Sequence, residues 1–162
     1  MATSEVIDRR GARVLLLDGS DRILLFRGHD PARPEDEPYW FTVGGGLRPG
    51  ETSDDGALRE LAEETGLRLL CRDLVGPVWD EVAEYPFEGR TYRQAQQFFL
   101  ARLPDACAVD TSGFDDVERR SVDMHRWWTV DELRRTSEAV YPRCLADLLD
   151  GLLAGRDVRA VS

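Results

Sequence analysis

Residues 45–67 read GGLRPGETSDDGALRELAEETGL, and this stretch decides the fold of the chain. Its glycine-rich start lets the backbone bend sharply and approach a ligand closely. Thr52 or Ser53 can cap the start of a helix, and the two aspartates that follow favour its first turn. Gly66 stands where a helix ends in a left-handed residue. The stretch therefore predicts a glycine-rich loop followed by a helix that ends at Gly66.

The expected helix has an apolar stripe and an acidic side. The stripe, at i, i+3, i+4 and i+7, is Leu58, Leu61, Ala62 and Thr65. Glu60, Glu63 and Glu64 fall within an arc of about 100° and should point away from that stripe. Glu60 and Glu64 repel each other at i and i+4, whereas Arg59 offers Glu63 an i, i+4 partner. Carboxylates placed this close together repel one another, so the arrangement indicates a bound cation.

Clustered carboxylates behind a glycine loop indicate a site for a hard divalent cation. Mg²⁺ and Mn²⁺ bind oxygen ligands, neutralise phosphate charge and lower the pKa of a bound water. A solvated acidic helix face after an ordinary glycine turn is the alternative. It would explain any three of these residues, but a chance match to all seven fixed positions is on the order of one in a hundred thousand. The sequence therefore predicts an Mg²⁺ site, with Mn²⁺ as a substitute, that acts on a diphosphate.

The same residues resemble the Nudix box of the Nudix (MutT-like) hydrolases at every fixed position, with Leu61 and Leu67 in its two aliphatic places. Family members often carry proline where this chain has Val43. The resemblance covers residues 45–67. It implies an α/β (α+β) fold, the α/β/α sandwich with a central mixed β-sheet. It also implies Mg²⁺-dependent cleavage of the diphosphate bond in a nucleoside diphosphate linked to another moiety, such as a nucleoside triphosphate, ADP-ribose, a nucleotide sugar or a dinucleoside polyphosphate.

The resemblance also implies a role for each residue of the box. The implied metal ligands or close supports are Glu60, Glu63 and Glu64. The implied catalytic residues within the box are Arg59, Glu63 and Glu64. Arg59 would orient a glutamate, and Glu51 would brace the loop against the helix. Gly45 and Gly66 would be structural requirements, and Glu51 would be structural as well. Gly45 and Gly46 are also expected to contact the substrate.

Outside the box, the candidates rest on less specific signals. Family members often supply a further acidic ligand or a catalytic base from the region ahead of residues 126–128, and Glu118 is the first choice there. A solvated loop acid is the alternative for Glu118, and Glu81 and Glu84 compete with it for the role. Arg27, at the end of an expected strand, could bind a substrate phosphate or pair with a surface acid.

The rest of the chain predicts a strand-rich domain. The expected strands are residues 13–17, 22–27, 40–43, 74–84, 91–103 and 125–128. Residues 18–21 would join the first two as a hairpin. Residues 129–132 form a capping-box pattern, and five leucines within residues 145–153 predict an amphipathic helix. One mixed sheet between helices is the economical architecture, and residues 1–162 are expected to form a single domain.

Charge and composition limit the partners and the compartment. The net charge of −10 argues against a nucleic-acid surface, so the expected partner is a small nucleoside diphosphate derivative. No apolar run approaches the ~20 residues of a membrane span, and residues 1–11 do not read as a secretory signal. Cys71, Cys107 and Cys144 contain no CxxC pair and are expected to be structural thiols. We therefore expect a cytoplasmic protein, and homodimers are frequent in the family.

Two other functions compete with hydrolysis of small nucleotides. A catalytically idle Nudix module that senses a nucleotide would keep the fold, but it would more often have lost acids of the box, and this chain has lost none. An enzyme that trims RNA ends is less attractive because of the acidic balance of the chain.

Overall fold

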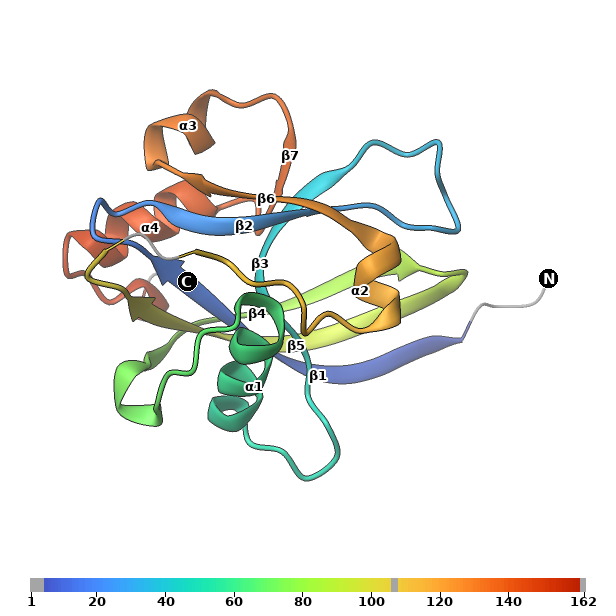
Figure 1. The fold of residues 1–162 in the computed structure, drawn as a ribbon, viewed down its shortest axis with the longest axis horizontal. Helices are drawn as coiled ribbons and strands as arrows, with labels where there is room; N and C mark the ends of the chain where they lie inside the picture. Colours follow the sequence, from blue (N-terminus) through green and yellow to red (C-terminus); the bar gives the residue numbers. More distant parts are fainter. Residues whose placement is uncertain (1–4, 106–107, 161–162) are drawn as a thin grey trace.

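The computed structural model describes residues 5–105 and 108–160, in which one mixed sheet lies between helices (Figure 1). The strands are β1 (Val6–Leu17), β2 (Ile23–Gly28), β3 (Tyr39–Gly46), β4 (Val75–Phe87), β5 (Arg90–Arg102), β6 (Val122–Trp128) and β7 (Ala139–Tyr141). The helices are α1 (Ser53–Thr65), α2 (Asp116–Ser121), α3 (Val130–Arg135) and α4 (Leu145–Leu153), with short 3-10 turns η1 (Cys71–Asp73) and η2 (Val158–Ala160). The sheet order is β4-β5-β1-β2-β3-β7, and β6 pairs with β2.

The central strand β1 separates two hydrophobic cores. It runs parallel to β5 and antiparallel to β3. Successive side chains of a strand point to opposite faces. On β1, Val14 and Leu16 pack on the core that includes α1, whereas Leu15 and Leu17 pack on the core that includes α3 and α4. Helices therefore cover both faces of the sheet, as the predicted α/β/α sandwich requires.

The expected strands are all present, but several are longer than predicted. β1 begins at Val6 rather than at residue 13, because its first half pairs with β5 while exposing charged side chains such as Arg9 and Arg10. The predicted capping box opens α3, where the Thr129 side chain accepts from the backbone N–H of Glu132 at 3.1 Å. Helix α2 and strand β7 were not predicted, because each is short and carries little periodicity of its own.

The cysteines that the structure describes lie on the surface. Cys71 and Cys144 are exposed free thiols, and Cys107 lies outside the described residues. None of the helices in residues 5–105 and 108–160 combines the length and the apolar character needed to cross a membrane.

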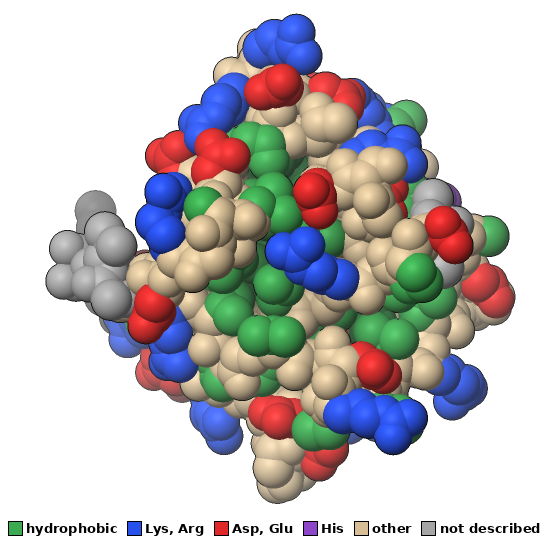
Figure 2. Space-filling model, turned by 90° about the vertical axis from the view of Figure 1, so that its left-hand side faces the viewer, with side chains coloured by type: hydrophobic (Ala, Val, Ile, Leu, Met, Phe, Trp, Pro, Cys, Tyr) green, Lys and Arg blue, Asp and Glu red, His purple; other side chains and the backbone are tan. Residues whose placement is uncertain are grey.

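The surface charge is mixed on the side that Figure 2 presents. Arginine and acidic side chains alternate around a group of hydrophobic side chains near the centre of this face. The net charge of −10 is therefore not a uniform acidic coat on this side. The local arrangement of charges, rather than the total, decides what each surface can bind.

Candidate metal centre

Helix α1 begins and ends where the sequence predicts. The Thr52 side chain accepts a hydrogen bond from the backbone N–H of Asp55 at 3.2 Å. Gly66 adopts a left-handed φ of 77°, and its N–H donates to the carbonyl oxygen of Ala62 at 2.9 Å. These local signals fix the register of the helix, and therefore the direction of the glutamates that it carries.

Two of the three glutamates of α1 are buried, which the sequence did not predict. Glu60 is 8% exposed and Glu64 is 3% exposed, whereas Leu58 and Ala62 of the predicted stripe are only half-buried. The cause lies in the glycine-rich end of β3. A methyl group at Gly45 would lie 2.8 Å from Oε1 of Glu60, so the absence of side chains there makes room for the carboxylate.

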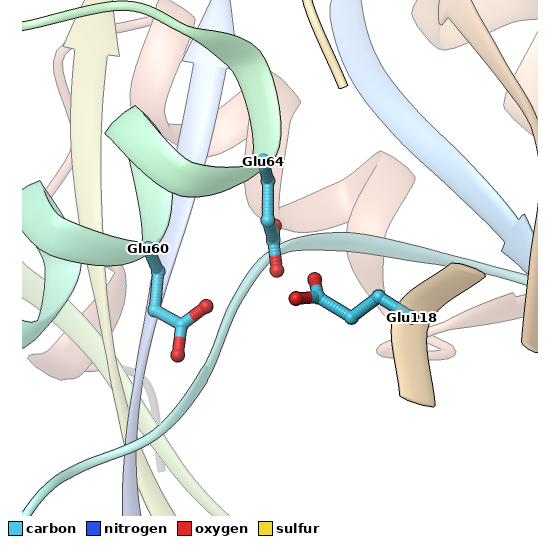
Figure 3. Close-up of side chains that lie close together, drawn as sticks. All are labelled: Glu60, Glu64 and Glu118. Carbon is cyan, nitrogen blue, oxygen red and sulfur yellow. The ribbon is translucent and has the colours of Figure 1, made fainter. Parts of the chain in front are cut away.

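Three carboxylates converge between α1 and α2 (Figure 3). Each of Glu60, Glu64 and Glu118 offers one carboxylate oxygen, and these oxygens all lie within 4.8 Å of one another. Glu60 and Glu64 extend from α1, and Glu118 extends from α2. Glu118 also belongs to the capping box of α2, in which its N–H donates to the Asp115 side chain at 2.8 Å. Glu118, the first candidate outside the box, therefore lies beside Glu60 and Glu64 of the box.

The electrostatics of this cluster favour a bound cation. Burial raises the pKa of Glu64 well above its usual range, the charges of Glu60 and Glu118 raise it further, and the N–H of Gly44, 3.0 Å from Oε2, opposes them. Burial also raises the pKa of Glu60, against the lowering effect of Arg59, and burial raises the pKa of Glu118. Buried carboxylates that repel one another form an all-oxygen donor set, which fits a hard divalent cation such as Mg²⁺ or Mn²⁺.

Arg59 ties the helix to the loop in front of it. Its guanidinium makes two 2.8 Å hydrogen bonds to the Glu51 carboxylate and a 3.1 Å bond to the carbonyl oxygen of Gly46. It also reaches Oε1 of Glu60 at 3.0 Å. The hydrogen bonds from Arg59 lower the pKa of Glu51 to about 2, so this carboxylate stays charged. Glu51 in turn accepts from the backbone N–H of Arg48 at 3.0 Å, which braces the loop against the helix.

Glu63 and Arg27 lie apart from the cluster. The Glu63 carboxylate is paired with Arg48 at 3.1 Å and with Arg59 at 3.2 Å, the latter being the expected i, i+4 pair. Arg27 donates two hydrogen bonds to Asp123, at 3.0 and 2.9 Å. Of the two alternatives that the sequence left open for Arg27, the structure records the pairing with a surface acid.

The two competing acids on β4 have other partners. Glu81 accepts from the side-chain amide of Gln96 at 2.6 Å, and Glu84 pairs with Arg93 at 3.4 Å. Neither belongs to the group of converging carboxylates in the part of the chain that the structure describes. Glu118 is therefore the acid outside the box that reaches it.

Sequence reasoning missed two features near the glycine loop. The first is the N–H of Gly44, which holds Glu64, and the run of three glycines was the available signal. The second is a groove of about 640 Å³ beside the N-terminus of α1, lined by several arginines. These arginines are Arg9, Arg10 and Arg48. Arg9 and Arg10 are adjacent in the sequence, but they lie far from the box along the chain. Nothing in the sequence indicated that they line a groove beside α1.

Comparison with known proteins assigns the chain to a family. The family model described as NUDIX domain matches residues 8–148, so the chain belongs to the NUDIX domain family. An RNA pyrophosphohydrolase from Caulobacter vibrioides is 32% identical, covering 83% of this chain and 77% of that protein. A MutT-like protein from Streptomyces ambofaciens is 30% identical, covering 79% of this chain and 71% of that protein. The alignments with three other curated relatives span 41%, 62% and 62% of those proteins' lengths.

Solved structures agree with the architecture. The NUDIX domain of NrtR from Shewanella oneidensis, in a cocrystal structure with ADP ribose, superposes with a TM-score of 0.63. It shares 16% sequence identity, over 90% of this chain and 88% of that chain. At this identity the similarity establishes the fold alone. The predicted family and the predicted fold are both confirmed.

Proposed function

We propose that this protein is an Mg²⁺-dependent pyrophosphohydrolase that cleaves a phosphoric anhydride bond in a nucleoside diphosphate derivative. The observation that carries the proposal is the convergence of Glu60, Glu64 and Glu118, with carboxylate oxygens within 4.8 Å of one another. A divalent cation bound there would neutralise phosphate charge and lower the pKa of a water molecule. The chain has all the acidic residues of the box, which favours hydrolysis over the alternative of an inactive module that senses a nucleotide.

The surrounding residues have distinct tasks in this proposal. Glu60, Glu64 and Glu118 would hold the cation, and a carboxylate of the site would accept the proton of the attacking water. Arg59 orients Glu60 and Glu63, and the N–H of Gly44 orients Glu64. Glu63 acts as a close support through its two arginine partners rather than as a ligand.

The arginines of the groove give the phosphates a second contact. Arg9, Arg10 and Arg48 line the groove together with Leu47 and Gly50, which follow the three glycines of the loop. Guanidinium groups suit phosphate oxygens because they donate in a fixed, planar fork. A small nucleotide derivative therefore fits the site despite the net charge of −10.

An RNA 5′ end is the second candidate substrate. Relatives over much of the chain bear the name RNA pyrophosphohydrolase, and the bond to be broken would have the same chemistry. The acidic balance of the chain still argues for a small molecule, because an RNA surface needs a basic patch larger than one groove.

The test is release of phosphate or pyrophosphate from a panel of compounds with Mg²⁺, with Mn²⁺ and with chelator. The panel contains nucleoside triphosphates, ADP-ribose, nucleotide sugars, dinucleoside polyphosphates and an RNA oligonucleotide with a 5′-triphosphate. We expect metal-dependent turnover of a small nucleotide, lost in Glu64→Gln and kept in Glu84→Gln. Tight nucleotide binding without turnover of any compound would replace this proposal with the sensing module.

The wider setting follows from the same proposal. We propose that residues 1–162 work as one domain, in the cytoplasm, because the widely spaced cysteines suit a reducing compartment. We also propose a homodimer, because homodimers are frequent in the family. The elution volume of the purified protein on a calibrated size-exclusion column tests this proposal.

A further inference from the structure

Three segments far apart in the sequence meet beside Glu118. They are helix α2, the tip of the β4–β5 hairpin at Glu88, and the start of the segment 29–38 that joins β2 to β3. Figure 1 shows α2 beside the turn between β4 and β5. Because α2 carries the carboxylate that completes the candidate metal centre, whatever holds this helix also sets the position of Glu118.

The contacts among these segments form a closed ring. Arg120 of α2 donates to Oε1 of Glu88 at 3.2 Å. The backbone N–H of Glu88 donates to Oδ1 of Asp30 at 3.0 Å, and Asp30 is only 7% exposed. The N–H of His29 then donates to the carbonyl oxygen of Ser121 at 2.8 Å, which returns the ring to α2. We call these contacts the Glu88 ring.

Glu88 is an unusual residue for its backbone position. Its φ is 49° and that of Gly89 is 76°, so both residues of this two-residue turn are left-handed. Such turns favour Gly, which has no Cβ atom to clash, or Asn and Asp, whose short polar side chains hydrogen-bond locally. The turn alone would be better served by glycine. What a glutamate adds at this point is the carboxylate that Arg120 binds.

Helix α2 needs outside support to hold Glu118 in place. It has six residues, fewer than an isolated helix requires in water. The hydrogen bond from the Asp115 N–H to Oε1 of Glu118 is 3.3 Å long, so the capping box holds this carboxylate loosely. Repulsion from Glu60 also pushes Glu118 away from the cluster when no cation is bound. A tether on the same short helix opposes that displacement.

We infer that Glu88 is a positioning residue for Glu118, acting through Arg120. This inference rests on the proposed function, in which Glu118 helps to hold the cation. The ion pair is partly exposed, and its side chains are 60% and 36% accessible for Arg120 and Glu88. A pair of this kind has a modest effect, so its loss should weaken cation binding by about three-fold rather than abolish it.

The test compares Glu88→Gly with the wild-type protein. Glycine suits the left-handed turn and should leave the midpoint of thermal unfolding unchanged or higher. The same variant loses the partner of Arg120, so we expect about three-fold weaker Mn²⁺ binding. Free Mn²⁺ is measured from its electron paramagnetic resonance signal during a titration. The Mn²⁺ concentration for half-maximal turnover should rise by the same factor while kcat at saturating Mn²⁺ stays close to wild type.

Matched variants separate positioning from general damage. Arg120→Gln should reproduce the weaker binding, whereas Arg119→Gln should not, because Arg119 pairs with Asp116 within the same helix. The exchanged pair Glu88→Arg with Arg120→Glu should restore part of the affinity. Equal Mn²⁺ binding by wild type and Glu88→Gly would overturn the positioning role alone. Failure of the wild-type protein itself to bind Mn²⁺ would overturn the proposed function and, with it, the role of Glu88.

Discussion

Glu51 and Glu64 are chemically identical side chains that the fold drives in opposite directions. Hydrogen bonds from Arg59 lower the pKa of Glu51 to about 2, whereas burial raises the pKa of Glu64 well above its usual range. Glu51 is therefore ionised and satisfied within the protein. Glu64 accepts a hydrogen bond from the N–H of Gly44, and a cation bound beside it would offset its charge.

The low pKa of Glu51 makes a prediction about stability and pH. A carboxyl group whose pKa is depressed in the folded state stabilises the fold above its unfolded pKa, and this contribution is lost as the pH falls through the folded value. Glu51→Gln should therefore lower the free energy of unfolding by about 2 kcal/mol at pH 7. The difference between variant and wild type should shrink between pH 4.5 and about 2. Urea denaturation at several pH values measures it, and a difference that does not change with pH would contradict the assignment.

At the scale of elements, the ends of a helix could be predicted from neighbouring residues, whereas packing between distant segments could not. Thr52 and Gly66 mark the ends of α1 through hydrogen bonds to neighbours in the sequence, so the helix could be predicted. The position of α2 depends on Phe114, whose ring packs edge-on against Phe26 at 5.6 Å. No local pattern encodes that contact. For this reason Glu118 could be a candidate from the sequence, but not a known neighbour of Glu64.

The burial of Glu60 and Glu64 was not predicted, for a related reason. Helical periodicity identified an apolar stripe, but it could not show that the glycine-rich end of β3 leaves space for Glu60 and Glu64 beside the sheet. Arg27 illustrates the same limit, because its partner Asp123 comes from a strand paired to β2 much later in the sequence. The residue types in the sequence indicated the chemistry of the site. Which of these residues lie together depends on tertiary contacts that the sequence does not reveal.

The segment that leads into α2 approaches α1 closely at Gly113. A methyl group there would lie 2.5 Å from the backbone carbonyl oxygen of Glu63, so Gly113→Ala must push the segment before α2 away from α1. We expect a loss of about 2 kcal/mol in stability, together with weaker Mn²⁺ binding, because Glu118 moves with α2. Gly19→Ala is the matched control, since its methyl group would lie 2.1 Å from the carbonyl oxygen of Pro104 in another loop.

Calorimetry and Mn²⁺ titration of the two glycine variants distinguish a clash that disturbs the metal site from one that only lowers the stability of the fold. Both variants should unfold at lower temperature than the wild type. Only Gly113→Ala should bind Mn²⁺ more weakly. If both variants bound Mn²⁺ with wild-type affinity, the close approach of Gly113 to α1 would have no part in building the site.

At the scale of the whole molecule, the candidate site depends on the complete sandwich. Glu60 and Glu64 come from a helix packed on one core, and Glu118 comes from a helix that leads into β6. The sheet holds these elements together, and no isolated segment could assemble the three acids. Binding of a cation to the folded state alone must therefore stabilise the whole fold.

This coupling predicts that Mg²⁺ raises the midpoint of thermal unfolding. A ligand present at 100 times its dissociation constant contributes about 2.7 kcal/mol, and chelator should reverse the effect. Glu64→Gln should show little or no increase, although its metal-free form should be at least as stable as the wild type because a buried charge is removed. Differential scanning calorimetry with and without Mg²⁺ measures both. An equal increase in the two proteins would mean that Mg²⁺ binds elsewhere.

The central claim is that the third carboxylate of the metal centre comes from Glu118 on α2 and not from Glu63 of the box. The most direct measurement is Mn²⁺ affinity, read from the electron paramagnetic resonance signal of the free ion, for Glu118→Gln and Glu63→Gln beside the wild type. We predict that Glu118→Gln weakens Mn²⁺ binding at least ten-fold, the loss expected for a direct ligand, and that Glu63→Gln weakens it by no more than about three-fold. Near-normal binding by Glu118→Gln together with loss of binding by Glu63→Gln would contradict the account.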